Sequence, residues 1–148
     1  MVSNLFARAN EKVVVDTNIV LDLFVFNDEA SRPLRDLLDA GTIQWLATAP
    51  MRVELERVLG YPQIVPRLAF YQLSPADVLE KFDQHTDIVP IAPKALISCA
   101  DPDDQCFIDL AVQHQARLIS KDREVLKMKK RLAAHGARTG RTLAETTA

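Results

Sequence analysis

Residues 12–16 have the sequence KVVVD, in which an unbroken β-branched run ends in a carboxylate. Such a run, without polar alternation, is typical of a strand buried on both faces of a parallel sheet. Further apolar runs predict strands at 43–47 and 117–120 and a short apolar piece at 88–91. Helical patterns lie between these runs, at 17–26, 29–40, 50–59, 66–86 (one or two helices), 103–115 and 123–135. Strands separated by helices predict an α/β fold with a mainly parallel sheet.

The composition is that of one globular domain. The chain has 148 residues, of which 48% are hydrophobic and 26% charged. We expect a single domain over residues 1–148, with its core at about 12–135 and weakly structured ends at 1–10 and 139–148. No apolar run approaches the ~20 residues of a membrane span. The start of the chain lacks the continuous apolar segment of a secretory signal. We therefore expect no membrane partner and a cytoplasmic location.

Charge is distributed unevenly along the chain, although the net charge is only −2. Residues 74–109 carry eight acids and two bases, whereas residues 117–141 carry nine bases and two acids. This asymmetry fits either mutual attraction of the two segments or an acidic, cation-binding pocket beside a basic rim. The basic residues that would contact RNA phosphates are Lys127, Lys129, Lys130 and Arg131. The alternative is that they form the solvated face of a helix.

Two cysteines, Cys99 and Cys106, have neither Cys-x-x-Cys spacing nor a histidine at zinc-finger spacing. We interpret both as buried, reduced thiols, which suits a reducing cytoplasm.

Two acids stand out in the first half of the chain. Asp16 directly follows the first strand, so its side chain is expected at the carboxyl edge of the sheet, where parallel sheets bind ligands. The alternative is that Asp16 caps the next helix. Glu54 borders the apolar stripe of its helix, where a carboxylate is costly unless it is paired or bound to a cation. Its alternative partners are Arg52 and Arg57.

Further acids follow in the second half. Asp101 begins the sequence DPDD, which suits a helix start with Asp101 as the N-cap. Asp104 shares the apolar face of that helix and is expected to project toward the sheet, whereas Asp109 lies on the opposite face and is expected to be solvated. Asp122 follows the strand at 117–120 and is again expected at the carboxyl edge; capping of the next helix by Asp122 or Ser120 is the alternative.

The predicted topology brings four carboxylates around one crevice. Like charges a few ångströms apart raise one another's pKa values, so they do not all ionise without a cation. Oxygen ligands without histidine or cysteine favour Mg²⁺ or Mn²⁺. Such a site suits metal-assisted hydrolysis of a phosphodiester.

The motifs carrying these acids resemble a PIN domain of the kind found in VapC-type toxins. They are VVVDTNIVLDLF, MRVELERVL, DPDDQCFIDLA and LISKDREVL, within about residues 12 to 135. The resemblance implies a three-layer α/β/α fold with a mainly parallel sheet of four or five strands. It implies that the four acids bind Mg²⁺ or Mn²⁺ and are catalytic: Asp16, Glu54, Asp104 and Asp122. Residues supporting them would be Asn18, Ser120, Asp103 and Glu124.

The resemblance also implies a function. It indicates a metal-dependent endoribonuclease that cleaves single-stranded or structured RNA, as the toxin component of a toxin–antitoxin pair. The expected partners are an RNA substrate, a protein antitoxin and, in a homodimer, a second copy of the chain. The alternative is a non-catalytic PIN scaffold that binds RNA or a protein. One departure is the tail, ARTGRTLAETTA, which lacks the proline usual in relatives, so we expect the last strand and helix to be absent or disordered.

Overall fold

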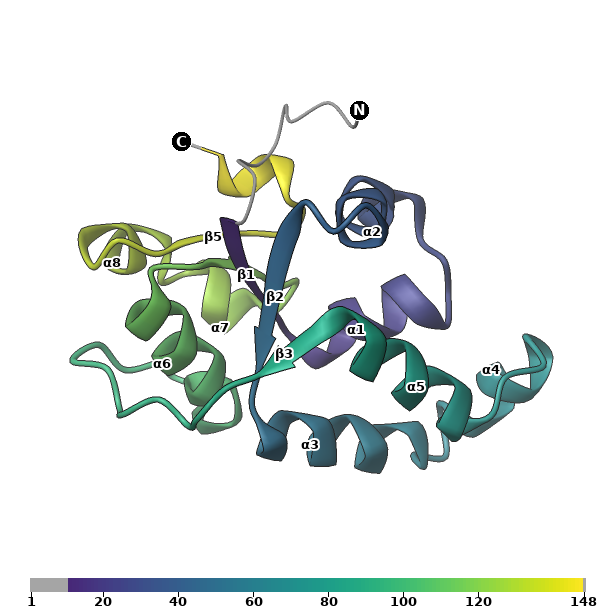
Figure 1. The fold of residues 1–148 in the computed structure, drawn as a ribbon. Coiled ribbons are helices and arrows are strands. Elements are labelled where there is room, and N and C mark those ends of the chain that lie inside the picture. Colours follow the sequence, from purple (N-terminus) through teal and green to yellow (C-terminus); the bar gives the residue numbers. More distant parts are fainter. Residues whose placement is uncertain (1–10, 148) are drawn as a thin grey trace.

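Five parallel strands form one sheet in the structure, a computed structural model that describes residues 11–147 (Figure 1). The prediction of weakly structured residues 1–10 lies outside this range. The strands are β1 (Glu11–Val15), β2 (Ile43–Ala47), β3 (Thr86–Ile88), β4 (Arg117–Ile119) and β5 (Arg138–Gly140). Their order is β3-β2-β1-β4-β5, which places the first strand at the centre. The predicted α/β fold with a parallel sheet is confirmed.

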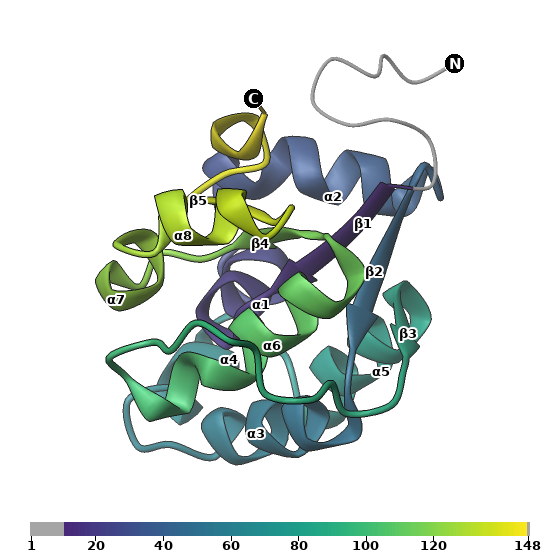
Figure 2. The same ribbon diagram turned by 90° about the vertical axis from the view of Figure 1, so that its left-hand side faces the viewer.

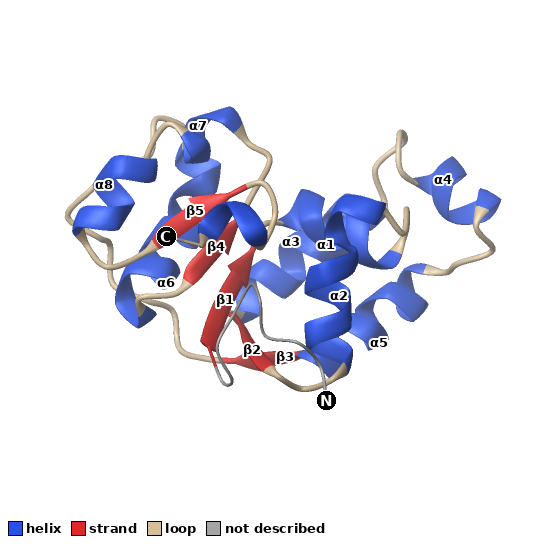
Figure 3. Ribbon diagram, turned by 90° about the horizontal axis from the view of Figure 1, so that it is seen from above, coloured by secondary structure: helices blue, strands red, loops and turns tan. Residues whose placement is uncertain are grey.

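Helices cover both faces of this sheet. They are α1 (Thr17–Phe24), α2 (Arg32–Asp39), α3 (Ala49–Leu59), α4 (Val65–Phe70), α5 (Pro75–His85), α6 (Gln105–His114), α7 (Arg123–Leu126) and α8 (Lys129–Ala134). Figure 2 shows α6 and α8 in front of the sheet, and Figure 3 shows α1, α2 and α5 on its other side. No helix within residues 11–147 combines the length and apolar composition needed to cross a membrane.

The core follows from the continuous apolar strands. Val13 and Val14 are fully buried, as expected for a central strand covered on both faces. Trp45 in β2 is 1% exposed, and its ring lies 5.9 Å from that of Phe24 and 5.3 Å from that of Phe82. These aromatic contacts join α1 and α5 to the sheet.

Local signals in the sequence account for several of these element boundaries. Gly41 ends the α2 region with a φ of +70°, a conformation that glycine adopts without strain. Ser74 begins α5 with a capping box that includes Asp77. Two predictions are corrected here. The apolar piece at 88–91 contributes only Ile88 to a strand, β3, which begins at Thr86 within the segment predicted as helix, and the predicted helix at 123–135 is two helices, with Met128 as the N-cap of the second.

The prediction for the tail is wrong. Residues 138–140 form β5, and Ala144–Thr146 form a 3-10 helix whose Thr146 is buried. β5 extends the sheet by backbone pairing with β4, which requires no particular side-chain signal. Gly140 allows the tail to fold back, because a Cβ at this position would lie 2.6 Å from the Cβ of Glu145. The absence of a proline was therefore not informative about order.

Candidate metal centre

Two neighbouring strands bring the first polar groups together. In the register of β1 and β4, Val15 lies beside Ile119, so Asp16 and Ser120 follow at the same edge. The backbone N–H of Asp16 donates to the carbonyl of Ile119 at 3.1 Å, and the hydroxyl of Ser120 donates to the Asp16 carboxylate. The other carboxylate oxygen accepts from the N–H of Ile19 at 3.1 Å. Asp16 is therefore both the helix cap and a buried carboxylate at the carboxyl edge.

Asp122 lies beside this pair because the chain turns immediately after β4. Its N–H donates to the hydroxyl of Ser120 at 3.0 Å, and its carboxylate accepts from the N–H of Glu124 at 2.8 Å as the cap of α7. Ser120 is fully buried and thus holds two acids, Asp16 through its proton and Asp122 through its oxygen.

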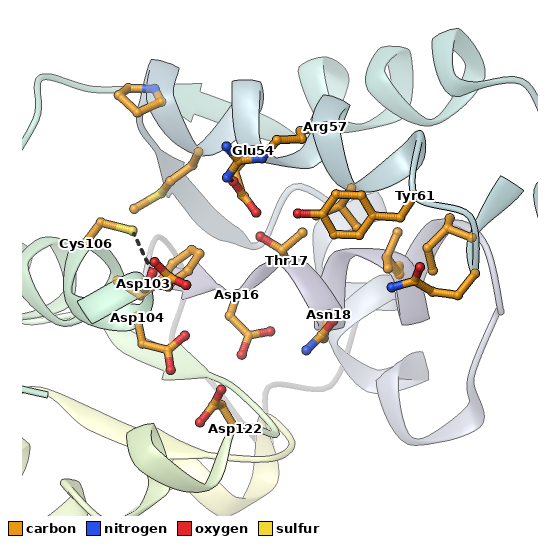
Figure 4. Close-up of a pocket in the computed structure, with 17 residues that line it drawn as sticks. Asp16, Thr17, Asn18, Glu54, Arg57, Tyr61, Asp103, Asp104, Cys106 and Asp122 are labelled. Carbon is orange, nitrogen blue, oxygen red and sulfur yellow. Dashed lines mark hydrogen bonds and ion pairs between the residues drawn. The ribbon is translucent and has the colours of Figure 1, made fainter. Parts of the chain in front are cut away.

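Asp104 reaches the same place from a different element. It ends the 3-10 helix Pro102–Asp104 just before α6 and is 9% exposed. Its Oδ2 atom is buried and has no hydrogen-bond partner within residues 11–147. Figure 4 shows Asp16, Asp104 and Asp122 pointing toward one another. A buried carboxylate oxygen without a donor is costly unless a proton or a cation satisfies it.

Asp101 joins this group, although sequence analysis assigned it only to capping. Carboxylate oxygens of Asp101, Asp104 and Asp122 lie within 4.8 Å of one another. Asp101 also caps the 3-10 helix, accepting from the N–H of Asp103 at 2.9 Å. The spacing contained the missing signal, because Asp101 caps a single 3-10 turn whose last residue is Asp104, and a turn of three residues brings its two ends to the same side.

The clustered carboxylates have raised pKa values, as expected for acids that need a cation to stay ionised together. Burial raises the pKa of Asp104 to about 7, with further contributions from Asp122, Asp101 and Asp16. Burial also raises the pKa of Asp16, although the hydrogen bonds from Ser120 and Ile19 act to lower it. A group of oxygen donors with one unsatisfied buried oxygen fits Mg²⁺ or Mn²⁺, which prefer hard oxygen ligands.

Glu54 lies across the cavity from these acids. It projects from α3, and its carboxylate accepts from the guanidinium of Arg57. The alternative pairing with Arg52 does not form, because Arg52 binds Asp83 at 2.7 Å. Figure 4 shows Glu54 and Arg57 on the wall opposite Asp104 and Asp122. In this structure Glu54 is thus an ion-paired residue of the cavity, outside the tight group of oxygens.

The cavity between these walls has a volume of about 510 Å³. Asn18 and Asp103 line it, whereas Ser120 lies beneath it as a support for Asp16. Cys106 also lines it and is exposed, which corrects the prediction that both cysteines are buried; Cys99 is buried. The apolar part of the lining includes Leu21, Met51, Val58, Tyr61, Ile64 and Phe107.

The predicted basic rim does not line this cavity. Lys127 is paired with Glu124 at 3.0 Å, and Glu124 itself is absent from the lining. Arg131 donates to the carbonyl of Ser98 at 3.4 Å, and Lys129 lines a separate cavity beside β5. These positions, like the exposed Lys130, are those expected for the alternative of a solvated helix face.

Asp109 has a structural role instead of being solvated as predicted. Its carboxylate accepts from the N–H of Ala95 at 2.9 Å and from the amide of Gln105 at 2.8 Å. Gln105 in turn accepts from the N–H of Cys99 at 2.7 Å. Together these side chains hold the loop that leads to Asp101.

Asp104→Asn is expected to stabilise the protein in a metal chelator. The pKa of Asp104 in the folded state lies near 7, above its ordinary value of 3.8. Protonation of Asp104 therefore stabilises the folded state. This stabilisation is fully present below pH 3.8 and is lost as the pH rises to about 7. Removing the charge should add about 1–3 kcal/mol to the free energy of unfolding at pH 8 and much less at pH 5. Chemical or thermal unfolding in EDTA at the two pH values measures this.

Asp16→Asn is the informative comparison for this experiment. It should stabilise less, because two hydrogen bonds already satisfy the Asp16 carboxylate. A lower unfolding midpoint for Asp104→Asn at both pH values contradicts the repulsion argument.

Comparison with known proteins agrees with this architecture. A family model described as PIN domain matches residues 12–124, the segment that contains the acids on both walls of the cavity. Among curated proteins, none matches the chain.

Proposed function

Because the chain belongs to the PIN domain family, whose members are generally nucleases, we propose that it is a metal-dependent endoribonuclease. The observation that carries this proposal is the buried Oδ2 of Asp104, which has no donor within residues 11–147 and faces two further aspartates. A non-catalytic scaffold gains nothing from this arrangement, since each uncompensated carboxylate costs folding free energy.

The residues that would hold a divalent cation are those with converging oxygens, Asp101, Asp104 and Asp122, with Asp16 beside them and with Glu54 joining them from the opposite wall of the cavity once it leaves Arg57. When bound, Mg²⁺ or Mn²⁺ supplies Lewis acidity toward the phosphoryl group and lowers the pKa of a coordinated water. Ser120 keeps the Asp16 carboxylate oriented, and Asn18 lies at the cavity where it can donate to a phosphate oxygen. The raised pKa of Asp104 makes cation binding compete with a proton, so affinity should increase with pH up to about 7.

The substrate and partners belong to the same proposal. RNA as the substrate, a role as the toxin of a toxin–antitoxin pair, and a cytoplasmic location are supported by the resemblance of the four motifs to VapC-type toxins. A protein antitoxin or a second copy of the chain needs apolar surface, and α4 presents Val65 and Phe70 with 49% and 78% exposure. A short antitoxin-like reading frame directly upstream of the coding sequence would support the toxin role.

The proposed activity has a direct test. The purified protein should cleave single-stranded or structured RNA in Mn²⁺ or Mg²⁺ and stop when EDTA is added, as followed on end-labelled RNA. A matched DNA oligonucleotide tests the choice of RNA. If no nucleic acid is cut in either metal while a protein partner or intact RNA binds tightly, the chain is the non-catalytic scaffold and the nuclease proposal is wrong.

A further inference from the structure

The proposed nuclease cavity has an unfavourable charge for its own substrate. Its lining within the described chain contains one cation, Arg57, and five carboxylates, at Asp16, Glu54, Asp103, Asp104 and Asp122. A polyanion is repelled from such a cavity unless positive charge meets its phosphates. The basic residues 127–131 do not line the cavity, and their contacts lie elsewhere. Among the described residues, Arg57 is therefore the basic side chain that lines the site and can contact a phosphate there, whereas Lys121, which also acts on Asp16, is paired with Asp22.

Arg57 is held in the cavity by a bond that is easily exchanged. It lies one helical turn after Glu54 on α3, and its Nη2 donates to the Glu54 carboxylate. The Arg57 side chain is 67% exposed and that of Glu54 is 34% exposed. Exposed ion pairs of this kind contribute little to stability. The other guanidinium N–H groups make no hydrogen bond with residues 11–147, so they remain open to a ligand.

We propose that Arg57 changes partner when substrate binds, a proposal that rests on the nuclease function above. In the metal-free cavity Arg57 neutralises Glu54. When the Glu54 carboxylate turns to a divalent cation, the released guanidinium binds a phosphate of the RNA. A planar guanidinium suits this role because it donates two parallel hydrogen bonds to a phosphate. Arg52, on the same helix, does not compete for the role, because it is bound to Asp83 outside this cavity.

The exchange predicts opposite effects on metal and on RNA. Arg57→Ala frees Glu54, so Mn²⁺ should bind as tightly as before or up to about fivefold more tightly. The same variant should raise the KM for RNA by roughly tenfold. It should also make the slope of log(kcat/KM) against log salt concentration about 0.7 less steep, because one phosphate contact is lost. Arg57→Lys keeps the charge without the planar fork, so its KM should be intermediate.

The measurements are calorimetric titration of chelator-stripped protein with Mn²⁺, and steady-state cleavage of a fluorogenic RNA at saturating Mn²⁺ over a salt series. Arg52→Ala, which removes an ion-paired arginine of the same helix, is the matched control and should change neither quantity. Unchanged RNA kinetics in Arg57→Ala overturn the proposal. A parallel loss of Mn²⁺ and RNA affinity also overturns it, because Arg57 would then only support Glu54.

Failure of the nuclease function is distinguishable from failure of this proposal. If neither the parent nor any variant cuts RNA, the catalytic proposal is wrong, and fluorescence anisotropy with labelled RNA in Mn²⁺ then decides the role of Arg57. Weaker RNA binding by Arg57→Ala than by Arg52→Ala supports the phosphate contact. Equal binding overturns it.

Discussion

Asp16→Asn is expected to reduce RNA cleavage roughly 100-fold or more while RNA binding persists or becomes tighter. The Asp16 carboxylate lies beside Asp122 and Asp104, so its charge is part of the field that holds a cation. Asparagine keeps an oxygen that can accept from the N–H of Ile19, so the cap of α1 survives. One negative charge fewer in the cavity also reduces repulsion of the RNA. Single-turnover cleavage and fluorescence anisotropy measure the two effects.

Asp28→Asn is the matched control for this variant. Asp28 likewise caps a helical turn, accepting from the N–H of Ala30 at 3.3 Å, but it does not line the cavity. It should cleave at the parental rate. Cleavage by Asp16→Asn at the parental rate would mean that the activity belongs to a contaminant or to another site.

Ser120→Ala is expected to weaken Mn²⁺ binding by about 10- to 100-fold, a loss typical of residues that orient metal ligands. The serine hydroxyl donates to Asp16 and accepts from the N–H of Asp122, so alanine removes one hydrogen bond from each. The pKa of Asp16 should rise further, because the bond from Ser120 lowers it in the intact protein. Cleavage should therefore require more metal and a higher pH, which a Mn²⁺ titration at several pH values measures.

Two variants make this result specific. Ser120→Thr keeps the hydroxyl and should recover most of the Mn²⁺ affinity. Ser31→Ala removes another buried serine, one that makes no capping hydrogen bond, and should leave Mn²⁺ affinity unchanged. Equal affinities for the alanine and threonine variants at position 120 would contradict a positioning role for the hydroxyl.

Much of the fold was predictable because its signals are local. The run at Val13–Val15, the glycine at 41 and the capping box at Ser74 each act within a few residues, and the structure has the expected elements there. The break before α8 was not predicted, because Val125, Met128 and Leu132 are all buried at spacings that a continuous helix also satisfies.

The positions of candidate site residues were predictable where a residue directly follows a strand. Asp16 and Asp122 follow neighbouring parallel strands, so their meeting is a consequence of topology. The partner of Glu54 was left open between two arginines, although helix geometry favours Arg57, since residues three apart are neighbours and residues two apart are not. The catalytic roles of Asp16, Glu54, Asp104 and Asp122 remain predictions that the experiments above address.

By itself the sequence determined the alternation of strands and helices, the acids at strand ends and the resemblance to PIN domains, because periodicity, capping and motif spacing are properties of short segments. Only the tertiary structure decided that Asp101 joins Asp104 and Asp122, that residues 127–131 do not line the cavity, and that the tail supplies β5. The physical reason is that each depends on which elements pack together. Burial of Asp104 and pairing of β5 with β4 exist only once distant segments are in contact.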